Sequence, residues 1–226
     1  MKKTYSIALD GPAGAGKSTI ARKLAEELGF RYVDTGAIYR TAAYFFDLIG
    51  ISPADKDGVR KYADELNIDI FYDDDGKQHM VMNTLDVTED IRSENISRKA
   101  SLISAQPVIR ELLLDMQREM ARKYNVVMDG RDIGTVVLPK ADVKIFLTAD
   151  AEVRAQRRVD QLTAKGEHCK YETVLKDIQQ RDYQDEHRAI APLKQAKDAV
   201  LLDTSKLSIE EVIAEARKIA EGKISL

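Results

Sequence analysis

The chain has 226 residues, a length that suits one compact domain with room for an insertion. Hydrophobic residues make up 44% of it and charged residues 32%, which excludes wholesale disorder and collagen-like order. The net charge is −3, from 35 basic and 38 acidic residues, so there is no overall positive field to hold nucleic acid or an anionic membrane. Any anion site must therefore be local.

Cysteine usage and the first residues bear on the compartment. The only cysteine is Cys169, which excludes an intramolecular disulfide framework and a cysteine-based zinc site and fits a reducing compartment. The apolar run at residues 5–9 is too short for a signal-peptide core or a membrane span. We therefore expect a cytoplasmic protein with no membrane partner and no nucleic-acid partner.

The first elements alternate between strand and helix. A short apolar strand at residues 5–9 is followed by a glycine-rich turn and then by a helix over 18–28, where Ile20, Leu24 and Leu28 recur at helical spacing. A second strand over 30–33 precedes a helix over 37–48. This order is typical of an α/β fold.

The hydrophobic period changes to two between residues 64 and 89. Ile68 and Ile70 alternate with polar residues, and Met80 and Met82 do so after an acidic Asp-Gly turn. The pattern predicts a small antiparallel hairpin inserted into the α/β order.

The second half of the chain returns to helices and buried strands. Residues 91–124 predict two helices, with Pro107 as a break or as a first-turn residue of the second. Continuous apolar runs at 126–129, 143–147 and 199–202 are typical of parallel strands buried on both faces. The helices expected around them are 151–162, 171–188 and 209–220.

These elements predict an α/β fold with a central parallel sheet of about five strands flanked by helices. We expect a single domain whose core is residues 1–60 and 90–226, with the β insert at 61–89. No internal repeat and no linker divides the chain.

The turn after the first strand is the most specific motif. Gly11-Pro12-Ala13-Gly14-Ala15-Gly16-Lys17-Ser18 matches G-x-x-x-x-G-K-[ST], in which glycines let backbone N–H groups converge on phosphate oxygens. Lys17 adds a positive charge, and Ser18 adds a hydroxyl that ligates Mg²⁺ directly. The alternative is a glycine turn that only caps a helix, but the strand before it and the helix after it favour a nucleoside triphosphate site.

Four further blocks follow this loop in the chain. The five blocks are Asp10-Gly11-Pro12-Ala13-Gly14-Ala15-Gly16-Lys17-Ser18-Thr19, Asp34-Thr35-Gly36-Ala37-Ile38-Tyr39-Arg40, Asp129-Gly130-Arg131-Asp132-Ile133-Gly134-Thr135, Lys144-Ile145-Phe146-Leu147 and Arg188-Ala189-Ile190-Ala191-Pro192-Leu193. Together, over nearly the whole chain, they resemble the bacterial cytidylate kinases, a branch of the P-loop nucleoside monophosphate kinases. The β insert resembles that family's enlarged monophosphate-binding region. Thr35 stands where many members carry serine, and it keeps the hydroxyl.

The resemblance implies a kinase that moves the γ-phosphoryl group of ATP to CMP or dCMP with Mg²⁺. ATP would lie on residues 11–19, and catalysis would rest on Lys17, Arg131, Arg188 and Asp129. Phosphoryl transfer needs positioning and charge stabilisation, and no general base is required because the acceptor phosphate is already anionic.

Three arginines of the predicted helix at 151–162 are candidates for a lid over the triphosphate. Arg154, Arg157 and Arg158 stand at i, i+3 and i+4, so they share one helix face, and the lid would cover about residues 151–165. The alternative is a solvated helix face with local ion pairs.

A second stripe lies on the following helix. Arg181, Asp185 and Arg188 stand at i, i+4 and i+7, with the same solvated alternative because acidic residues surround them. The resemblance implies that both arginines contact the acceptor phosphate and that Asp185 accepts hydrogen bonds from sugar hydroxyls.

Asp129 ends a buried strand, where ligands of open α/β sheets gather. This position suits a carboxylate that organises Mg²⁺ through water. The alternatives are a cap on the next helix and a pair with Arg131, which itself resembles a clamp on the acceptor phosphate.

Recognition of cytosine requires an acceptor for its N4 amino group and a donor for N3. The resemblance implies that Ser101, Arg110 and Asp132 read the base, and their side chains supply a hydroxyl, a cationic donor and a carboxylate acceptor. The remaining residues that it places around the acceptor nucleotide are Thr35, Arg40, Arg131, Arg181 and Arg188, with Tyr39 as a wall.

Two other functions stay open. One is a kinase of another small acceptor, such as UMP or shikimate, and the other is a nucleotide-dependent switch that binds a protein partner. We expect a monomer. The residues assigned to surface or structural roles are His79, His168, His187 and Cys169.

Overall fold

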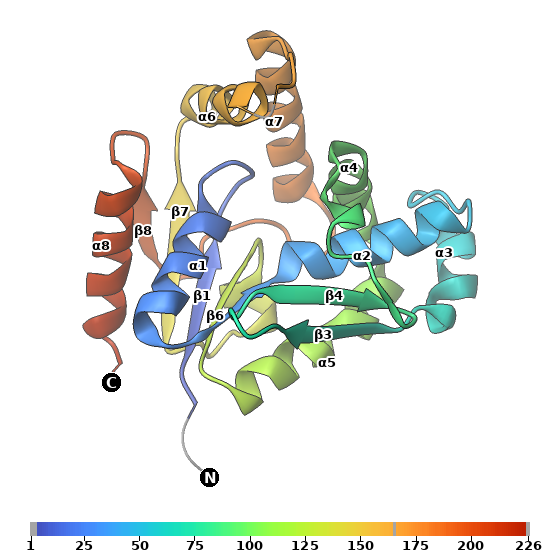
Figure 1. Cartoon of the computed structure of the whole chain (residues 1–226), viewed down its shortest axis with the longest axis horizontal. Coiled ribbons are helices and arrows are strands. Elements are labelled where there is room, and N and C mark those ends of the chain that lie inside the picture. Colours follow the sequence, from blue (N-terminus) through green and yellow to red (C-terminus); the bar gives the residue numbers. More distant parts are fainter. Residues whose placement is uncertain (1–3, 165, 225–226) are drawn as a thin grey trace.

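The computed structural model describes residues 4–164 and 166–224, and it contains two sheets (Figure 1). The main sheet is parallel throughout, in the order β2-β6-β1-β7-β8. Its strands are β1 (Ser6–Asp10), β2 (Arg31–Asp34), β6 (Val126–Gly130), β7 (Val143–Thr148) and β8 (Val200–Asp203). The predicted parallel sheet of about five strands is therefore confirmed.

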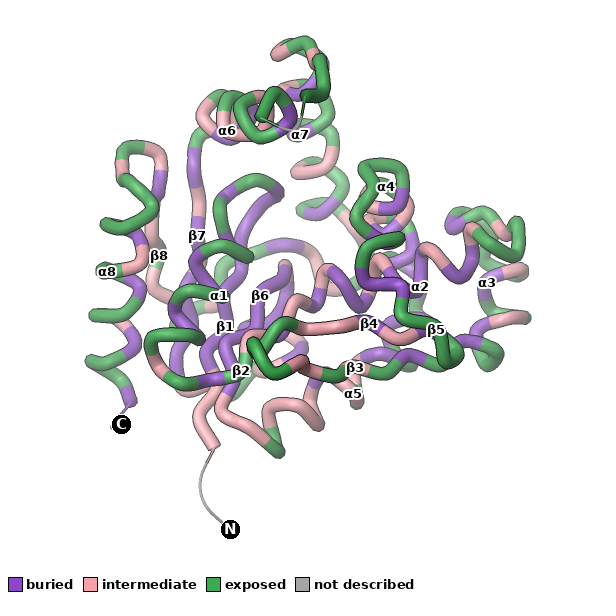
Figure 2. Tube along the Cα trace, in the orientation of Figure 1, coloured by how far each residue is buried: buried purple, intermediate pink, exposed green. Residues whose placement is uncertain are grey.

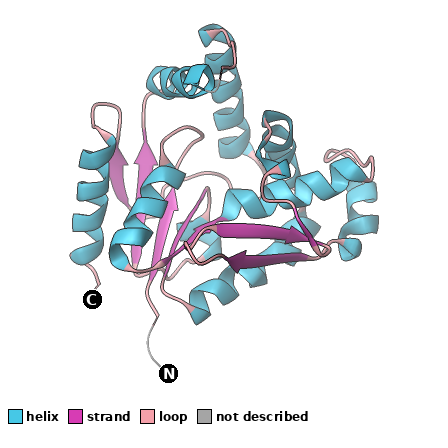
Figure 3. Ribbon diagram, viewed as in Figure 1, coloured by secondary structure: helices cyan, strands magenta, loops and turns pink. Residues whose placement is uncertain are grey.

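Helices surround this sheet (Figure 3). They are α1 (Lys17–Leu28), α2 (Thr35–Leu48), α3 (Lys56–Tyr62), α4 (Glu94–Ile103), α5 (Pro107–Lys123), α6 (Ala151–Ala164), α7 (Tyr171–His187) and α8 (Ile209–Glu221), with short turns η1 (Ala63–Glu65), η2 (Asp90–Arg92) and η3 (Ile133–Val137). Pro107 is the first residue of α5, as predicted. Within the described part of the chain, no helix is long and apolar enough to cross a membrane.

The predicted insert is a three-stranded antiparallel sheet of β3 (Ile68–Tyr72), β4 (Gln78–Met82) and β5 (Leu85–Asp86). The acidic turn closes the hairpin as expected, because Gly76 takes a φ of 74° and its N–H bonds to the carbonyl of Asp73 at 2.9 Å. The helix α3 was not predicted. It spans the boundary placed at residue 60, and it is short, with Val59 as its only buried residue.

The sheet separates two cores. On one face, α1 and α8 pack Ile20, Leu24 and Val212 against the strands. On the other face, α2, α4 and α5 form a larger core that includes Met80 of the insert, so the insert shares its core with the rest of the domain. The buried strand centres and exposed outer helix faces follow this division (Figure 2).

Helices α6 and α7 form a separate layer. They pack on each other through a small core of Ala155, Leu162, Val174 and Ile178. In Figure 1 this pair stands beyond the carboxyl ends of β1 and β7, above the loop that joins β1 to α1. The predicted lid segment therefore faces the phosphate-loop end of the sheet.

Candidate active site

The loop between β1 and α1 has the geometry of a phosphate cradle. Gly11 has a φ of 150°, and a Cβ built there would stand 2.0 Å from the carbonyl oxygen of Leu147. Gly14 and Gly16 have φ values of 76° and 87°, which side chains rarely tolerate. The three glycines let the loop lie close against β7 and turn into α1 at Lys17.

Lys17 is buried, with 6% of its surface exposed. Its Nζ donates to the carbonyl oxygen of Pro12 at 2.7 Å, within the same loop. Burial lowers the pKa of Lys17 to about 7, and the positive charge of Arg131 acts in the same direction. A phosphate beside this amine would restore the charged form and gain a strong hydrogen bond.

Asp129 lies beside the start of α1 rather than in an ion pair. Ser18 Oγ donates to Asp129 Oδ2 at 2.9 Å, and the Tyr32 hydroxyl donates to Oδ1 at 2.9 Å. Burial, helped by the charge of Asp34, raises the pKa of Asp129 to about 6. Neither alternative for Asp129 is found, since Arg131 pairs with another carboxylate and the side chain caps no helix.

Thr35 and Arg40 lie on the first turns of α2. The Thr35 hydroxyl donates to the backbone carbonyl of Asp129 at 2.7 Å, which ties α2 to the end of β6. Arg40 Nη2 pairs with Asp34 Oδ2 at 3.0 Å, and Asp34 also caps α2 by accepting from Ala37 N. Both residues thus reach the site from α2, and Asp34 at the end of β2 holds Arg40.

Asp132 stands at the centre of a buried ring of hydrogen bonds. One of its carboxylate oxygens accepts from Arg110, and the other accepts from Arg188 Nη2 at 3.0 Å. The same two arginines meet again at Ser104, whose carbonyl accepts from Arg110 Nη1 at 3.3 Å and whose Oγ accepts from Arg188 Nη1 at 3.2 Å. Residues predicted to read the base and hold the phosphate therefore contact each other.

A second group adjoins this ring. Arg131 Nε donates to Asp185 Oδ2 at 2.7 Å, and Ser101 Oγ donates to Asp185 Oδ1 at 3.4 Å. Burial opposes ionisation of Asp185, but the surrounding arginines outweigh it and hold its pKa below the ordinary value. Arg181 is different, because its Nε is buried without a partner, and burial together with Arg131 lowers its pKa.

Arg131 and Arg181 thus place two like charges side by side, and Arg131 also acts on Lys17. An anion between them would relieve the repulsion and satisfy the unpaired nitrogen. A cavity of about 230 Å³ between α4 and α7 includes Arg181 in its wall.

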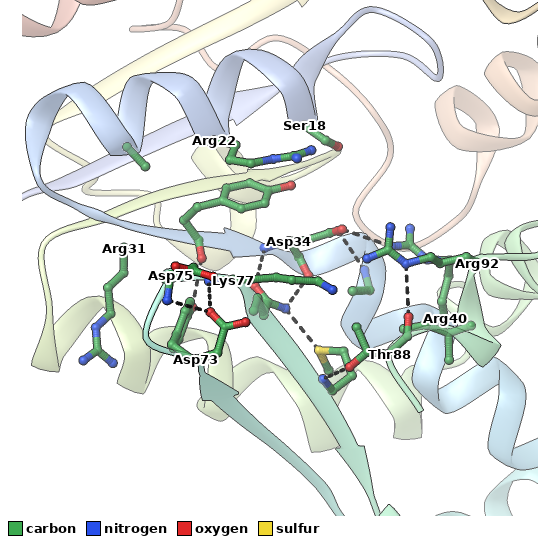
Figure 4. Close-up of a pocket in the computed structure, with 18 of the residues that line it drawn as sticks. Ser18, Arg22, Arg31, Asp34, Arg40, Asp73, Asp75, Lys77, Thr88 and Arg92 are labelled. Carbon is green, nitrogen blue, oxygen red and sulfur yellow. Dashed lines mark hydrogen bonds and ion pairs between the residues drawn. The ribbon is translucent and has the colours of Figure 1, made fainter. Parts of the chain in front are cut away.

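A larger cleft of about 1030 Å³ opens between α1, β2, the insert and α4. In Figure 4, Ser18 and Arg22 of α1 face Asp34 across the cleft, with Arg40 and Arg92 to one side. The insert contributes its acidic turn and Lys77 to the lining. The lining runs from Ser18 at the start of α1 to Arg40 of α2 and Arg92, and among the described residues it does not include the groups around Asp132 and Asp185.

The three arginines of α6 do not converge on one point. Arg154 is buried, donates to the carbonyl of Ala13 in the phosphate loop at 2.9 Å, and pairs with Asp182 of α7. Arg157 donates to the carbonyl of Thr204 at 2.6 Å, and Arg158 pairs with Glu94 of α4. They share one helix face but reach three different segments.

The ring centre of Tyr39 lies 5.7 Å from the Arg110 guanidinium, and its role as a wall stays a prediction. The histidines and the cysteine lie elsewhere. His79 bridges carboxylates of the insert and His187 stacks on Tyr183, while His168 is exposed and Cys169 packs on the α6–α7 core.

Several residues of the site were not predicted from the sequence. Tyr32 and Ser104 contribute hydroxyls, and Asp182 pairs with Arg154. Asp10 is 4% exposed, and burial raises its pKa to about 6. A charged residue that ends a buried strand just before a phosphate loop was a visible signal for Asp10, but Ser104 has no comparable signal in the sequence.

Comparison with known proteins shows similarity to one family over nearly the whole chain. The family model described as "Cytidylate kinase" matches residues 7–222. A cytidylate kinase of Carboxydothermus hydrogenoformans is 49% identical over 217 residues, covering 96% of this chain and 97% of that protein. One of Exiguobacterium is 45% identical over 221 residues, covering 98% of each.

The comparison with solved structures supports the fold and nothing beyond it. An uncharacterised protein from Eubacterium ventriosum has a TM-score of 0.52 at 14% identity and covers 96% of this chain and 99% of its own.

Proposed function

The chain belongs to the cytidylate kinase family, and from this membership we infer that the cleft, the phosphate loop and the groups around Asp132 and Asp185 together form its active site. The reaction is transfer of the γ-phosphoryl group of ATP to CMP or dCMP, which gives ADP and CDP or dCDP. We propose that the phosphate loop holds the donor and that the residues around Asp132 and Asp185 hold the acceptor.

The observation that carries this assignment is a row of positive side chains between the phosphate loop and the groups around Asp132 and Asp185. Buried Lys17 and half-buried Arg131 and Arg181 lie close enough that Arg131 helps to lower the pKa of both others. A site for two phosphorylated molecules requires cations that meet both, because the charge in the transition state is spread over the transferred group.

The residues divide the work by position. Lys17 and the loop amides hold the donor phosphates, and the lid arginines on α6 approach the same loop through Arg154. Arg131, Arg181 and Arg188 surround the acceptor phosphate, while Asp185 orients the sugar. Asp132, Arg110 and Ser101 supply the acceptor and donors that cytosine needs.

Magnesium fits the donor side of the site. Ser18 Oγ and Asp129 Oδ2 lie 2.9 Å apart, and both are oxygen ligands of the kind that Mg²⁺ prefers. We propose that Ser18 ligates the ion directly and that Asp129 holds it through water. Magnesium bound there supplies partial neutralisation of the donor phosphates.

The remaining assignments concern the moving parts and the setting. We propose that the insert at 61–89 and the lid at about 151–165 close over the substrates bound to the core. The enzyme is proposed to act as a monomer in the cytoplasm. The single cysteine supports the compartment, because a chain without a disulfide framework suits a reducing environment.

A coupled assay of ADP release tests the function directly. The purified chain is given ATP and Mg²⁺ with CMP, dCMP, UMP, AMP or shikimate, and the phosphorylated product is identified. We expect CMP and dCMP to give kcat/KM values at least about tenfold above UMP, as loss of matched base hydrogen bonds requires. Slow ATP hydrolysis without a phosphorylated product would instead favour a switch protein.

A further inference from the structure

Asp10 links the donor half of the site to the acceptor half. It ends β1 directly before Gly11, the first residue of the phosphate loop. Its Oδ1 accepts from Ile133 N at 2.8 Å, and its Oδ2 accepts from Gly134 N at 2.7 Å. These two amides directly follow Asp132, which lies in the ring of acceptor-side arginines.

The Asp10 carboxylate accepts from two backbone amides for which the described part of the chain offers no other hydrogen-bond acceptor. Ile133 and Gly134 begin the one-turn helix η3, and the first N–H groups of a helix lack partners within it. Both residues are buried, so their N–H groups receive a hydrogen-bond acceptor from Asp10 and not from bulk water. Only the ionised side chain can accept at both oxygens at once.

The side chain is not needed for the sheet itself. Asp10 is paired in register with Gly130 of β6 and Phe146 of β7 through its backbone. The sheet pairing therefore does not use the side chain of Asp10. That side chain packs closely against residue 134, because a Cβ on Gly134 would lie 3.3 Å from Asp10 Oδ2 and 3.1 Å from Lys144 Cδ.

We infer that Asp10 is the positioning residue that sets the distance between the phosphate loop and the acceptor residues Arg131 and Asp132. This inference rests on the proposed function and deepens it. Reacting groups must be aligned closely for transfer, so a shift of about 1 Å between the two halves can reduce turnover about 100-fold even when both substrates still bind.

The first test is Asp10→Asn, which keeps the size of the side chain but turns an N–H₂ group toward one of the amides. We expect kcat at saturating ATP and CMP to fall 10- to 100-fold, with the Kd of ADP and the KM of CMP changed less than threefold. Hydrogen exchange of the Ile133 and Gly134 amides should accelerate in the ligand-free protein, which reports the contact without catalysis.

Asp142→Asn is the matched control. Asp142 Oδ2 accepts from Ser6 N at 2.9 Å and Ser6 Oγ at 3.2 Å, so it is a carboxylate bonded to the other end of the same strand. This variant should lower the melting temperature while keeping kcat within twofold of the parent. An equal loss of kcat in both variants, or a folded Asp10→Asn variant with parental kcat, overturns the inference.

Gly134→Ala tests the same contact from the other side if Asp10→Asn does not fold. The added methyl pushes against Asp10 Oδ2, so we expect kcat to fall at least fivefold while the KM of CMP holds within threefold. Unchanged kcat in this variant overturns the inference. Failure of the unmodified enzyme to phosphorylate CMP would instead overturn the proposed function, and the exchange measurement would still decide the contact.

Discussion

Three residues beside the phosphate loop are buried in surroundings that disfavour their charged forms. Burial raises the pKa of Asp10 and of Asp129 to about 6 and lowers that of Lys17 to about 7. Each change favours the neutral form of the group over its charged form. Such groups cluster at functional sites because the ligand supplies the missing compensation.

Lys17→Ala removes the buried ammonium from this environment. Because Lys17 donates only to Pro12 in its own loop, the fold should survive, while turnover should fall about 1000-fold through loss of charge compensation. The measurement is ADP release beside a melting curve. A folded variant that turns over near the parental rate would remove Lys17 from the mechanism.

Asp129→Asn should change how the free energy of unfolding depends on pH. The folded pKa is raised above the unfolded value of 3.8, so the folded state binds more protons, and stability is lost as pH rises through 4 to 6. About two pKa units correspond to about 3 kcal/mol, less what the lost hydrogen bonds contributed.

At pH 7.5 the empty variant should therefore be more stable than the parent by about 1–2 kcal/mol, and at pH 4 the gain should vanish. Urea unfolding at the two pH values measures both. A variant that is less stable at pH 7.5 would show that the bonds from Ser18 and Tyr32 outweigh the burial penalty.

Asp132→Asn addresses the base. If the carboxylate accepts from the cytosine amino group, the amide can turn a donor toward uracil O4 and relax discrimination by about 1–3 kcal/mol. The ratio of kcat/KM for CMP to that for UMP measures this. Because Arg110 and Arg188 both bond Asp132, a common loss with an unchanged ratio would assign it to arginine positioning instead.

At the scale of elements, the insert is attached to the main sheet by specific side chains. Gln78 of β4 accepts from Asp34 N at 2.8 Å and donates to Asp34 O at 3.3 Å, and the Tyr72 hydroxyl donates to Tyr32 O at 2.9 Å. Asp34 pairs with Arg40, so the attachment ends at the acceptor side of the cleft. We therefore expect a nucleotide bound beside Arg40 to shift the position of the insert.

Closure should accordingly protect two segments from amide exchange. A bisubstrate analogue is expected to slow exchange at least tenfold in residues 64–89 and 151–164, since water must be excluded during transfer. Helix α8 is the internal control, because it packs on the far side of α1 from the insert. Equal protection everywhere would indicate general stabilisation, and none in either segment would exclude a clamp.

The sequence predicted most elements but few partners. Buried apolar runs specify β6 and β7 because both faces of each strand are covered, whereas α3 has one buried residue and left no period to detect. Spacing placed Arg154 and Arg157 on one face, yet their long side chains reach Ala13 and Thr204. Which acceptor an arginine meets depends on tertiary packing that no local pattern contains.

At the scale of the whole molecule, the acidic chain gathers several arginines around Asp132 and Asp185. The arginines of the acceptor cluster come from α5, the end of β6 and α7, and they converge only because the sheet brings these elements together. This local cluster of cations exists in a chain of net charge −3, and it depends on the complete fold.

The position of β1 has a consequence for synthesis on the ribosome. Ile7 pairs with Val127 on one side and with Val143 on the other, so the first strand made must wait for both neighbours. At about 5–20 residues per second the wait is on the order of ten seconds. Meanwhile α2, the insert, α4 and α5 can assemble their own core.

The core of α2, the insert, α4 and α5 should therefore begin to form before the phosphate loop is held in place. Nascent chains stalled before β6 emerges should be cleaved readily by protease within residues 6–28, and protection should arise only after residues 143–148 leave the exit tunnel. Early protection of residues 6–28 would mean that β1 has a transient partner other than its final neighbours.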